Sequence, residues 1–271
     1  MTQYSVLPKK YQFDLLPQID SYSHCRIYDN ELIIKEYESC CYNLSVLDQI
    51  IHLDLPGYSF AERIYCNEDL SKFYLVGPFY KDYCSISDAN FIISDKVNGL
   101  IVMKKMLLHL KEAHKKGFNP YDNHGGNYIV NSFLNVLGID CDFSCFRKQF
   151  TFVIDSIPAY FEDFFDNDMF IDFQFSSYYL NLFDKFQMLD MFFYYLRFNE
   201  FRRYNIFGIE VLNQIKPILR DIPLPNNVQN YLQKLFCGMI PNFDDYFIEE
   251  LIDPLICYYA NQNVRKRKGE E

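Results

Sequence analysis

The sequence predicts an α+β protein in which a small strand-rich lobe, residues 1–80, precedes a larger helical lobe, residues 81–271. Strand signals are concentrated before Gly77-Pro78, whereas the longest helical patterns follow it. Hydrophobic residues make up 49% of the 271 positions, which is enough for a sizeable core. The lobes are expected to meet at a hinge near residues 78–82, and clefts between lobes are favoured ligand sites.

Two hairpins and one helix are predicted in the first lobe. Asp29-Asn30 is a turn signal between two apolar runs, and a second polar turn at 67–69 separates two more. Asn43 is a candidate N-cap for the short helix. The predicted elements are the hairpin 25–28 with 31–37, the helix 44–53, and the hairpin 61–66 with 72–76.

The second lobe is predicted to be mainly helical. A helix over 97–116 has apolar residues on one side and ends at Gly117. The segment 182–198 is apolar on nearly every face, which predicts a helix buried in the middle of the lobe. The other predicted elements are two short strands, 127–130 and 135–139, two helices, 212–219 and 228–236, and a solvated basic tail at 265–268.

Composition and charge exclude several function classes. Lysine and arginine total 26 against 36 aspartates and glutamates, so the net charge of −10 argues against a nucleic-acid polymer as partner but not against one nucleotide in a local pocket. The start of the chain lacks the apolar stretch of a signal peptide, and the longest apolar run, 191–196, is too short for a transmembrane segment. Nine cysteines without paired CxxC motifs indicate reduced thiols and a cytoplasmic protein rather than structural zinc.

The polar loop after Gly117 carries the strongest chemical signal. It presents Asp122, His124 and Asn127, and two short strands then lead to Asp140. A carboxylate and a carboxamide at the mouth of a hairpin form a good oxygen site for Mg²⁺, and a second carboxylate nearby suits orientation of a hydroxyl nucleophile. We therefore predict Asn127 and Asp140 as metal ligands and Asp122 as the catalytic base, with His124 bracing the loop.

This segment resembles the catalytic loop and metal-binding strand of the protein-kinase-like superfamily. Asp122 lies five residues before Asn127, and Asp140 follows Asn127 by thirteen, as in that superfamily. The run from His114 to Gly117 resembles the Leu-His-x-x-Gly run before the loop. The Asp-x-His-x-x-Asn form of the loop is similar to that of aminoglycoside, choline and lipopolysaccharide kinases, the small-molecule and atypical branch.

The resemblance implies a bilobal protein-kinase-like fold and an ATP-dependent phosphotransferase that uses Mg²⁺. The phosphoryl acceptor would be a hydroxyl of a small molecule, a glycan or lipid headgroup, or a protein. The backbone of Pro78, Phe79 and Tyr80 is implied to receive the base of the nucleotide. Asp142 is either a second metal ligand or a cap.

The resemblance also assigns a role to Lys35. It implies that Lys35 contacts the phosphates of the nucleotide and pairs with Asp48 of the following helix. Because side chains alternate along a strand, Lys35 shares a face with Ile33, and we expect its ammonium in the cleft towards Asp140. An edge lysine that extends its stem over apolar surface is the alternative.

Departures from the family pattern support a second hypothesis. The first 34 residues contain no glycine, Pro120 replaces a histidine before the loop, and Asp140-Cys141-Asp142 replaces Asp-Phe-Gly. These features favour a catalytically inactive pseudokinase that acts as a nucleotide- or protein-binding scaffold. Acidic and aromatic residues alternate over 160–175, which is either a docking surface for a protein partner or a solvated loop. Retention of all three polar residues of the loop and strand favours the enzyme.

Overall fold

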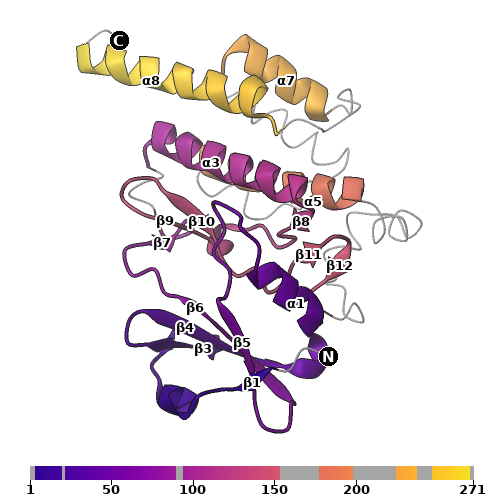
Figure 1. Ribbon diagram of the computed structural model, residues 1–271. Coiled ribbons are helices and arrows are strands. Elements are labelled where there is room, and N and C mark those ends of the chain that lie inside the picture. The colour runs from indigo at the N-terminus through magenta and orange to yellow at the C-terminus, as the bar shows by residue number, and fades with distance from the viewer. Residues whose placement is uncertain are drawn as a thin grey trace.

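The computed structural model describes residues 4–19, 22–89, 94–152, 177–197, 224–236 and 246–268. Within these ranges the chain is a mixed α+β protein, which confirms the predicted class. Figure 1 shows a sheet at one end of the molecule, short strands in the middle and long helices stacked at the other end. The predicted division into two lobes at residue 80 stays a prediction.

Six strands form the largest sheet. They are β1 (Ser5–Val6), β2 (Gln18–Ile19), β3 (Tyr22–Tyr28), β4 (Leu32–Glu38), β5 (Arg63–Cys66) and β6 (Lys72–Pro78). Their order is β1-β5-β6-β4-β3-β2, with β1 parallel to β5 and the other neighbours antiparallel. In the pair β4–β6, Lys35 lies opposite Leu75, and Ile33 lies opposite Gly77.

The predicted hairpins of the first lobe are confirmed. Asp29 and Asn30 have φ angles of 52° and 55°, in the left-handed region that these two residue types tolerate best after glycine. Their turn joins β3 to β4, so that Tyr28 pairs with Leu32. The second hairpin forms between β5 and β6, and β6 continues to Pro78.

One face of the six-stranded sheet is covered by the N-terminal segment. Ile34 is fully buried there, in one cluster with Tyr11 and Phe13. These two aromatic residues belong to the 3₁₀ turns η1 (Lys9–Tyr11) and η2 (Phe13–Leu15).

The opposite face of the sheet packs on helix α1 (Leu44–Ile51), which forms where it was predicted. Leu47 of α1 packs against Phe73 of β6. Because Ile34 is buried on the far side, its neighbours Ile33 and Lys35 lie on the α1 side of the sheet.

The middle of the molecule contains two small sheets. Their orders are β10-β9-β7 and β12-β11-β8. The strands are β7 (Cys84–Ser85), β8 (Phe118–Asn119), β9 (Tyr128–Val130), β10 (Val136–Gly138), β11 (Cys145–Phe146) and β12 (Gln149–Phe150). β9 and β10 are the two short strands expected on either side of a turn.

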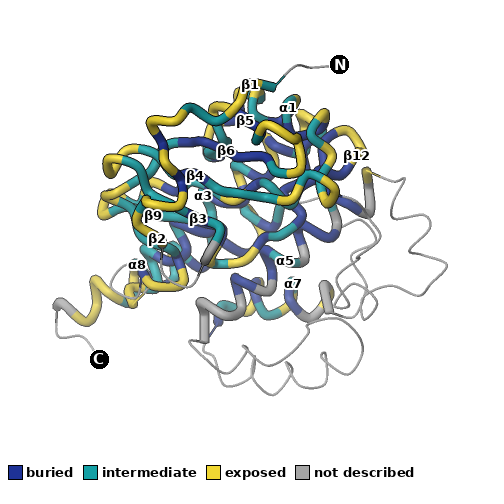
Figure 2. Tube along the Cα trace, turned by 90° about the horizontal axis from the view of Figure 1, so that it is seen from below, coloured by how far each residue is buried: buried dark blue, intermediate teal, exposed yellow. Residues whose placement is uncertain are grey.

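Helix α3 (Lys96–Lys115) is the predicted helix after the first lobe. Asp95 caps it by accepting a hydrogen bond from Val97 N at 2.8 Å. Gly117, with a φ of 76°, provides the left-handed turn that follows its C-terminus. One side of the helix is buried and the other carries exposed residues, which Figure 2 colours dark blue and yellow.

Helix α5 (Ser177–Arg197) is the predicted core helix, and it begins five residues earlier than expected. Its side chains Met188, Leu189 and Phe192 are at most 2% exposed. They share a cluster with Met103 and Met106 of α3. The described side chains of α5 therefore confirm that the helix lies in the core. Leu196 is not among these described side chains.

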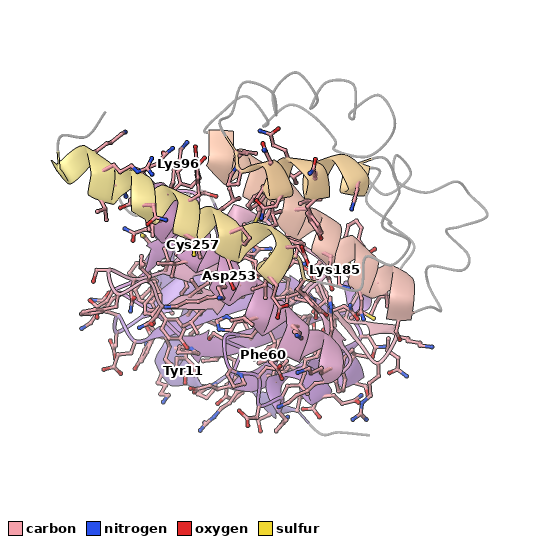
Figure 3. The ribbon with its side chains drawn as sticks, turned by 90° about the horizontal axis from the view of Figure 1, so that it is seen from above. Tyr11, Phe60, Lys96, Lys185, Asp253 and Cys257 are labelled. Carbon is pink, nitrogen blue, oxygen red and sulfur yellow. The ribbon has the colours of Figure 1, made fainter. Side chains whose placement is uncertain are left out.

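Helices α7 (Asn226–Phe236) and α8 (Asp253–Lys268) complete the helical layer, with the π-helical turn η8 (Ile248–Ile252) before α8. The predicted basic tail, residues 265–268, forms the last turn of α8, and its side chains Arg265 and Lys266 are exposed, as expected for a solvated segment. Asp253 accepts a hydrogen bond from Lys104 of α3 at 2.6 Å, and the Lys96 ammonium lies 4.7 Å from the Tyr259 ring centroid. Figure 3 shows Lys96 and Asp253 along this α3–α8 contact, which holds α8 in place.

Two predicted features, the helix 212–219 and the acidic aromatic segment 160–175, lie outside the described residues. Among the helices that are described, none is long and apolar enough to cross a membrane.

The buried position of α5 predicts a large stability effect for Leu189→Ala. The free energy of unfolding should fall by about 2–5 kcal/mol, because the substitution leaves a cavity among side chains of α3 and α5. Leu108→Ala is the matched control, since Leu108 is 42% exposed on α3 and should change stability by less than about 0.5 kcal/mol. Urea unfolding followed by circular dichroism measures both, and equal losses would contradict the assignment of α5 to the core.

Candidate functional site

Lys35 forms an ion cluster with two carboxylates that are distant in sequence. Its ammonium donates to Asp140 Oδ1 and, at 2.8 Å, to Asp142 Oδ2. The side chains of Lys35 and Asp142 are 12% and 14% exposed, whereas that of Asp140 is 46% exposed. The predicted approach of Lys35 to Asp140 is confirmed, and an edge lysine on the outer surface is excluded. Asp140 is the member of the cluster that is open to a ligand.

The charges of this cluster shift each other's pKa. Burial disfavours the Lys35 ammonium, but Asp142 and Asp140 outweigh burial and raise its pKa above the ordinary value. Burial raises the pKa of Asp142 to about 6. Burial acts in the same direction on Asp140, but the Lys35 ammonium and the contact with Asp142 hold the Asp140 pKa below its usual range. One ammonium therefore faces two carboxylates, which leaves a negative charge when both are ionised.

A cavity of about 400 Å³ opens beside the ion cluster. Apolar side chains from β4, α1 and β6 line it together with Lys35, Asp140 and Asp142; the apolar set includes Ile33, Leu47, Ile50, Ile51 and Leu75. This volume lies within the range of small-molecule sites, which are typically apolar with a few convergent polar groups. The arrangement suits a ligand with an apolar part, and the negative charge of the cluster favours a cation, or an anion that carries a cation, beside it.

The segment 78–80 also lines the cavity, as predicted for Pro78, Phe79 and Tyr80. The backbone N–H of Phe79, however, donates to the Glu31 carbonyl at 2.7 Å. The Phe79 N–H is therefore occupied within the chain, and the role of the 78–80 backbone in binding a base stays a prediction.

The predicted pairing of Lys35 with Asp48 is wrong. Among the described residues, the carboxylates bound to Lys35 are Asp140 and Asp142. Helix α1 instead presents Leu47 and Ile51 to the cavity, and Asp48 lies between them on a different side of the helix. The helix is held by its apolar face, so its orientation is set by packing.

Asp122, Asn127 and Asp140 line one small recess. The Asn127 amide nitrogen donates to the Asp122 carbonyl at 2.8 Å and to Asp122 Oδ2 at 3.2 Å. The carbonyl of Asn127 accepts from Ile139 N at 2.8 Å, which places it beside the residue that precedes Asp140. The structure thus brings together the three residues that the spacing singled out.

His124 braces the loop between Asp122 and Asn127, as predicted. Its Nδ1 accepts a hydrogen bond from Gly126 N at 3.0 Å and caps the 3₁₀ turn η4 (Gly125–Asn127). Its Nε2 lies 3.6 Å from Asp122 Oδ2. This contact with Asp122 raises the pKa of His124.

The loop is anchored by Asp184 of α5, a residue to which the sequence analysis assigned no role. Its carboxylate is fully buried. Its Oδ1 accepts hydrogen bonds from Tyr121 N at 2.9 Å and from Asn123 Nδ2 at 2.8 Å. Its Oδ2 accepts a hydrogen bond from Asn119 Nδ2 at 2.8 Å and lies 2.8 Å from His114 Nε2. A charged residue in a helix that is apolar on all sides was the signal for such an anchor.

Tyr121 shows why this anchor is needed. Its φ of 66° lies in the left-handed region, which is costly for a bulky side chain. The hydrogen bond from its backbone N–H to Asp184, together with burial of its ring among Phe150, Phe152 and Phe183, holds this conformation. Asp122, the next residue, is therefore placed by a strained but well-supported turn.

Comparison with known proteins adds no relative: no protein-family model matches the chain, and no curated protein matches it.

The anchoring role predicts a severe effect of Asp184→Asn. The asparagine amide nitrogen would face donors that an Asp184 oxygen now accepts from. Each buried polar group left unpaired costs about 1–3 kcal/mol, so the free energy of unfolding should fall by about 3 kcal/mol. Asp29→Asn is the matched control, because asparagine suits an exposed turn with positive φ. Denaturant unfolding of both variants tests this, and a wild-type midpoint for Asp184→Asn would refute the anchor.

Proposed function

We propose that this chain is a magnesium-dependent phosphotransferase of the protein-kinase-like fold that uses ATP. The observation that carries the proposal is the cavity of about 400 Å³ that joins an apolar slot to the cluster of Lys35, Asp140 and Asp142. A nucleotide is divided in a matching way, because it has a flat base at one end and phosphates that bind cations at the other. The arrangement of a sheet with one packed helix before a largely helical remainder supports the bilobal form of that fold.

The donor atoms at the recess fit Mg²⁺. Asp140 offers a half-exposed carboxylate, Asp142 a second one, and Asn127 its amide oxygen, because its amide nitrogen is used by Asp122. No group of three or more histidine, cysteine or acidic side chains in the described residues could enclose a metal. Mg²⁺ does not need such a cage, since it is usually held by one or two carboxylates, waters and phosphate oxygens.

Each polar residue then has a role. Bound Mg²⁺ would neutralise charge on the phosphates, which is the main requirement of phosphoryl transfer. Lys35 would contact the phosphates from β4, and Asp140 and Asn127 would hold the metal. Asp122, whose side chain is 35% exposed, would accept the proton of the acceptor hydroxyl. The acceptor would be a small molecule, a glycan or lipid headgroup, or a protein.

One observation favours the second candidate, a catalytically inactive scaffold. Lys35 is already bound by two carboxylates within the chain, so its ammonium is satisfied without a phosphate ligand. In a scaffold this cluster would serve only to join the sheet to the segment 140–142. The two candidates differ in whether Mg²⁺ and a nucleotide bind together.

The enzyme proposal predicts that ATP and Mg²⁺ together raise the melting temperature of the purified protein. At a nucleotide concentration one hundred times the Kd, linkage stabilises the folded state by about 2.7 kcal/mol. Differential scanning fluorimetry with ATP alone, Mg²⁺ alone and both separates the contributions. No shift at millimolar ATP and Mg²⁺ with folded protein would favour the scaffold.

The proposal also predicts different defects for two aspartate variants. Asp140→Asn should weaken Mg²⁺–ATP binding, because Asp140 touches the metal before reaction, whereas Asp122→Asn should retain binding and lower turnover by about 10²–10⁴-fold. Asp54→Asn, an exposed aspartate outside the cavity, is the control and should retain both. Calorimetric titration and ATP consumption measure the two properties, and wild-type turnover in both variants would show that the loop is not catalytic.

A further inference from the structure

Tyr37 occupies a position at the ion cluster that the proposed function does not use. It lies two residues after Lys35 on β4, so both side chains project from the same face of the strand. The Tyr37 hydroxyl donates a hydrogen bond to Asp142 Oδ2, the same oxygen that receives Lys35 at 2.8 Å. One strand therefore provides two donors to one carboxylate oxygen.

The Tyr37 ring is fixed by aromatic neighbours. It stacks on Phe73 with ring centroids 5.2 Å apart and an interplanar angle of 24°, and Tyr42 lies at 4.9 Å from it. Phe73 is fully buried in the core between the sheet and α1. Because the ring cannot turn away without leaving these contacts, the hydroxyl is held at a defined point beside Asp142.

The segment that receives this hydroxyl is fixed from its other side as well. The carbonyl of Asp142 accepts from Thr151 Oγ1 at 2.6 Å, and the carbonyl of Cys141 accepts from Ser144 Oγ at 2.7 Å. Asp140 itself has a φ of 59°, in the left-handed region that aspartate tolerates better than most residues. Strand β4 contacts this segment through two carboxylates, Asp140, which receives Lys35, and Asp142, which receives both Lys35 and Tyr37.

We propose that Tyr37 is a positioning residue that holds the Asp140–Cys141–Asp142 segment in its metal-binding conformation through the Asp142 carboxylate. Glycine is absent from this segment, and the tyrosine keeps it in one arrangement. The effect on nucleotide binding rests on the proposed function, whereas the effect on the conformation of the segment does not.

The test compares Tyr37→Phe with Tyr42→Phe in the full chain. Each substitution removes one hydroxyl from the same aromatic cluster, but no hydrogen bond joins the Tyr42 hydroxyl to the described residues. Tyr37→Phe should raise the KM for Mg²⁺–ATP about tenfold and leave kcat within about threefold, the pattern expected when binding common to substrate and transition state is lost. Tyr42→Phe should leave both unchanged.

Amide hydrogen exchange of residues 140–144 without nucleotide provides a readout that is independent of activity. Tyr37→Phe should speed exchange there about tenfold, and Tyr42→Phe should not. In an Asp142→Ala background, Tyr37→Phe should have no further effect, because its partner is absent. Wild-type exchange in Tyr37→Phe would overturn the positioning role even if Mg²⁺–ATP binds; altered exchange in a protein that binds no Mg²⁺–ATP would uphold it and reject the proposed function instead.

Discussion

The sharing of one lysine ammonium between two carboxylates is the contact on which the site depends. Lys35 comes from the six-stranded sheet, and Asp140 and Asp142 follow the small β9–β10 sheet, so this cluster joins parts of the chain more than 100 residues apart in sequence. Because two carboxylates face one ammonium, the cluster keeps an uncompensated negative charge beside the cavity. A divalent cation would supply the positive charge that this arrangement lacks, and the same cation would bind phosphate oxygens, which is why we favour a metal-bound nucleotide over an apolar ligand.

The second constraint acts from the helical side. Asp184 gathers donors from the residues on either side of Pro120, and its burial makes each of these hydrogen bonds costly to lose. The loop is thus supported by a helix that carries buried side chains, while the cavity is built on the sheet. Within the loop, the Asn127 amide donates to both the carbonyl and Oδ2 of Asp122, which orients the two side chains relative to each other.

Local patterns in the sequence were sufficient for the two N-terminal hairpins, for β9 and β10 and for helices α1, α3, α5 and α7, but not for the short strands β1, β2, β7, β8, β11 and β12. The hairpin at Asp29-Asn30 and the helix ending at Gly117 are set by backbone preferences that act within a few residues. Contacts between residues far apart in the sequence could not be predicted from local patterns. Asp48 was placed beside Lys35 by analogy, but the apolar face of α1 decides its rotation. Tyr37 and Asp184 were missed because their partners lie 105 residues away for Tyr37 and 61 to 70 away for Asp184, and only the folded chain brings them together.

We propose that this ion cluster binds a metal and a nucleotide together. A crystal structure with Mn²⁺ in place of Mg²⁺ and a non-hydrolysable ATP analogue would decide this, because Mn²⁺ can be located by its anomalous scattering. A metal peak is expected at roughly 2.1 Å from Asp140 and Asn127 oxygens, with Lys35 turned towards the phosphates and the base in the apolar part of the cavity. An empty cavity with Lys35 still bound to both aspartates, or a metal at a site without Asp140, would contradict it.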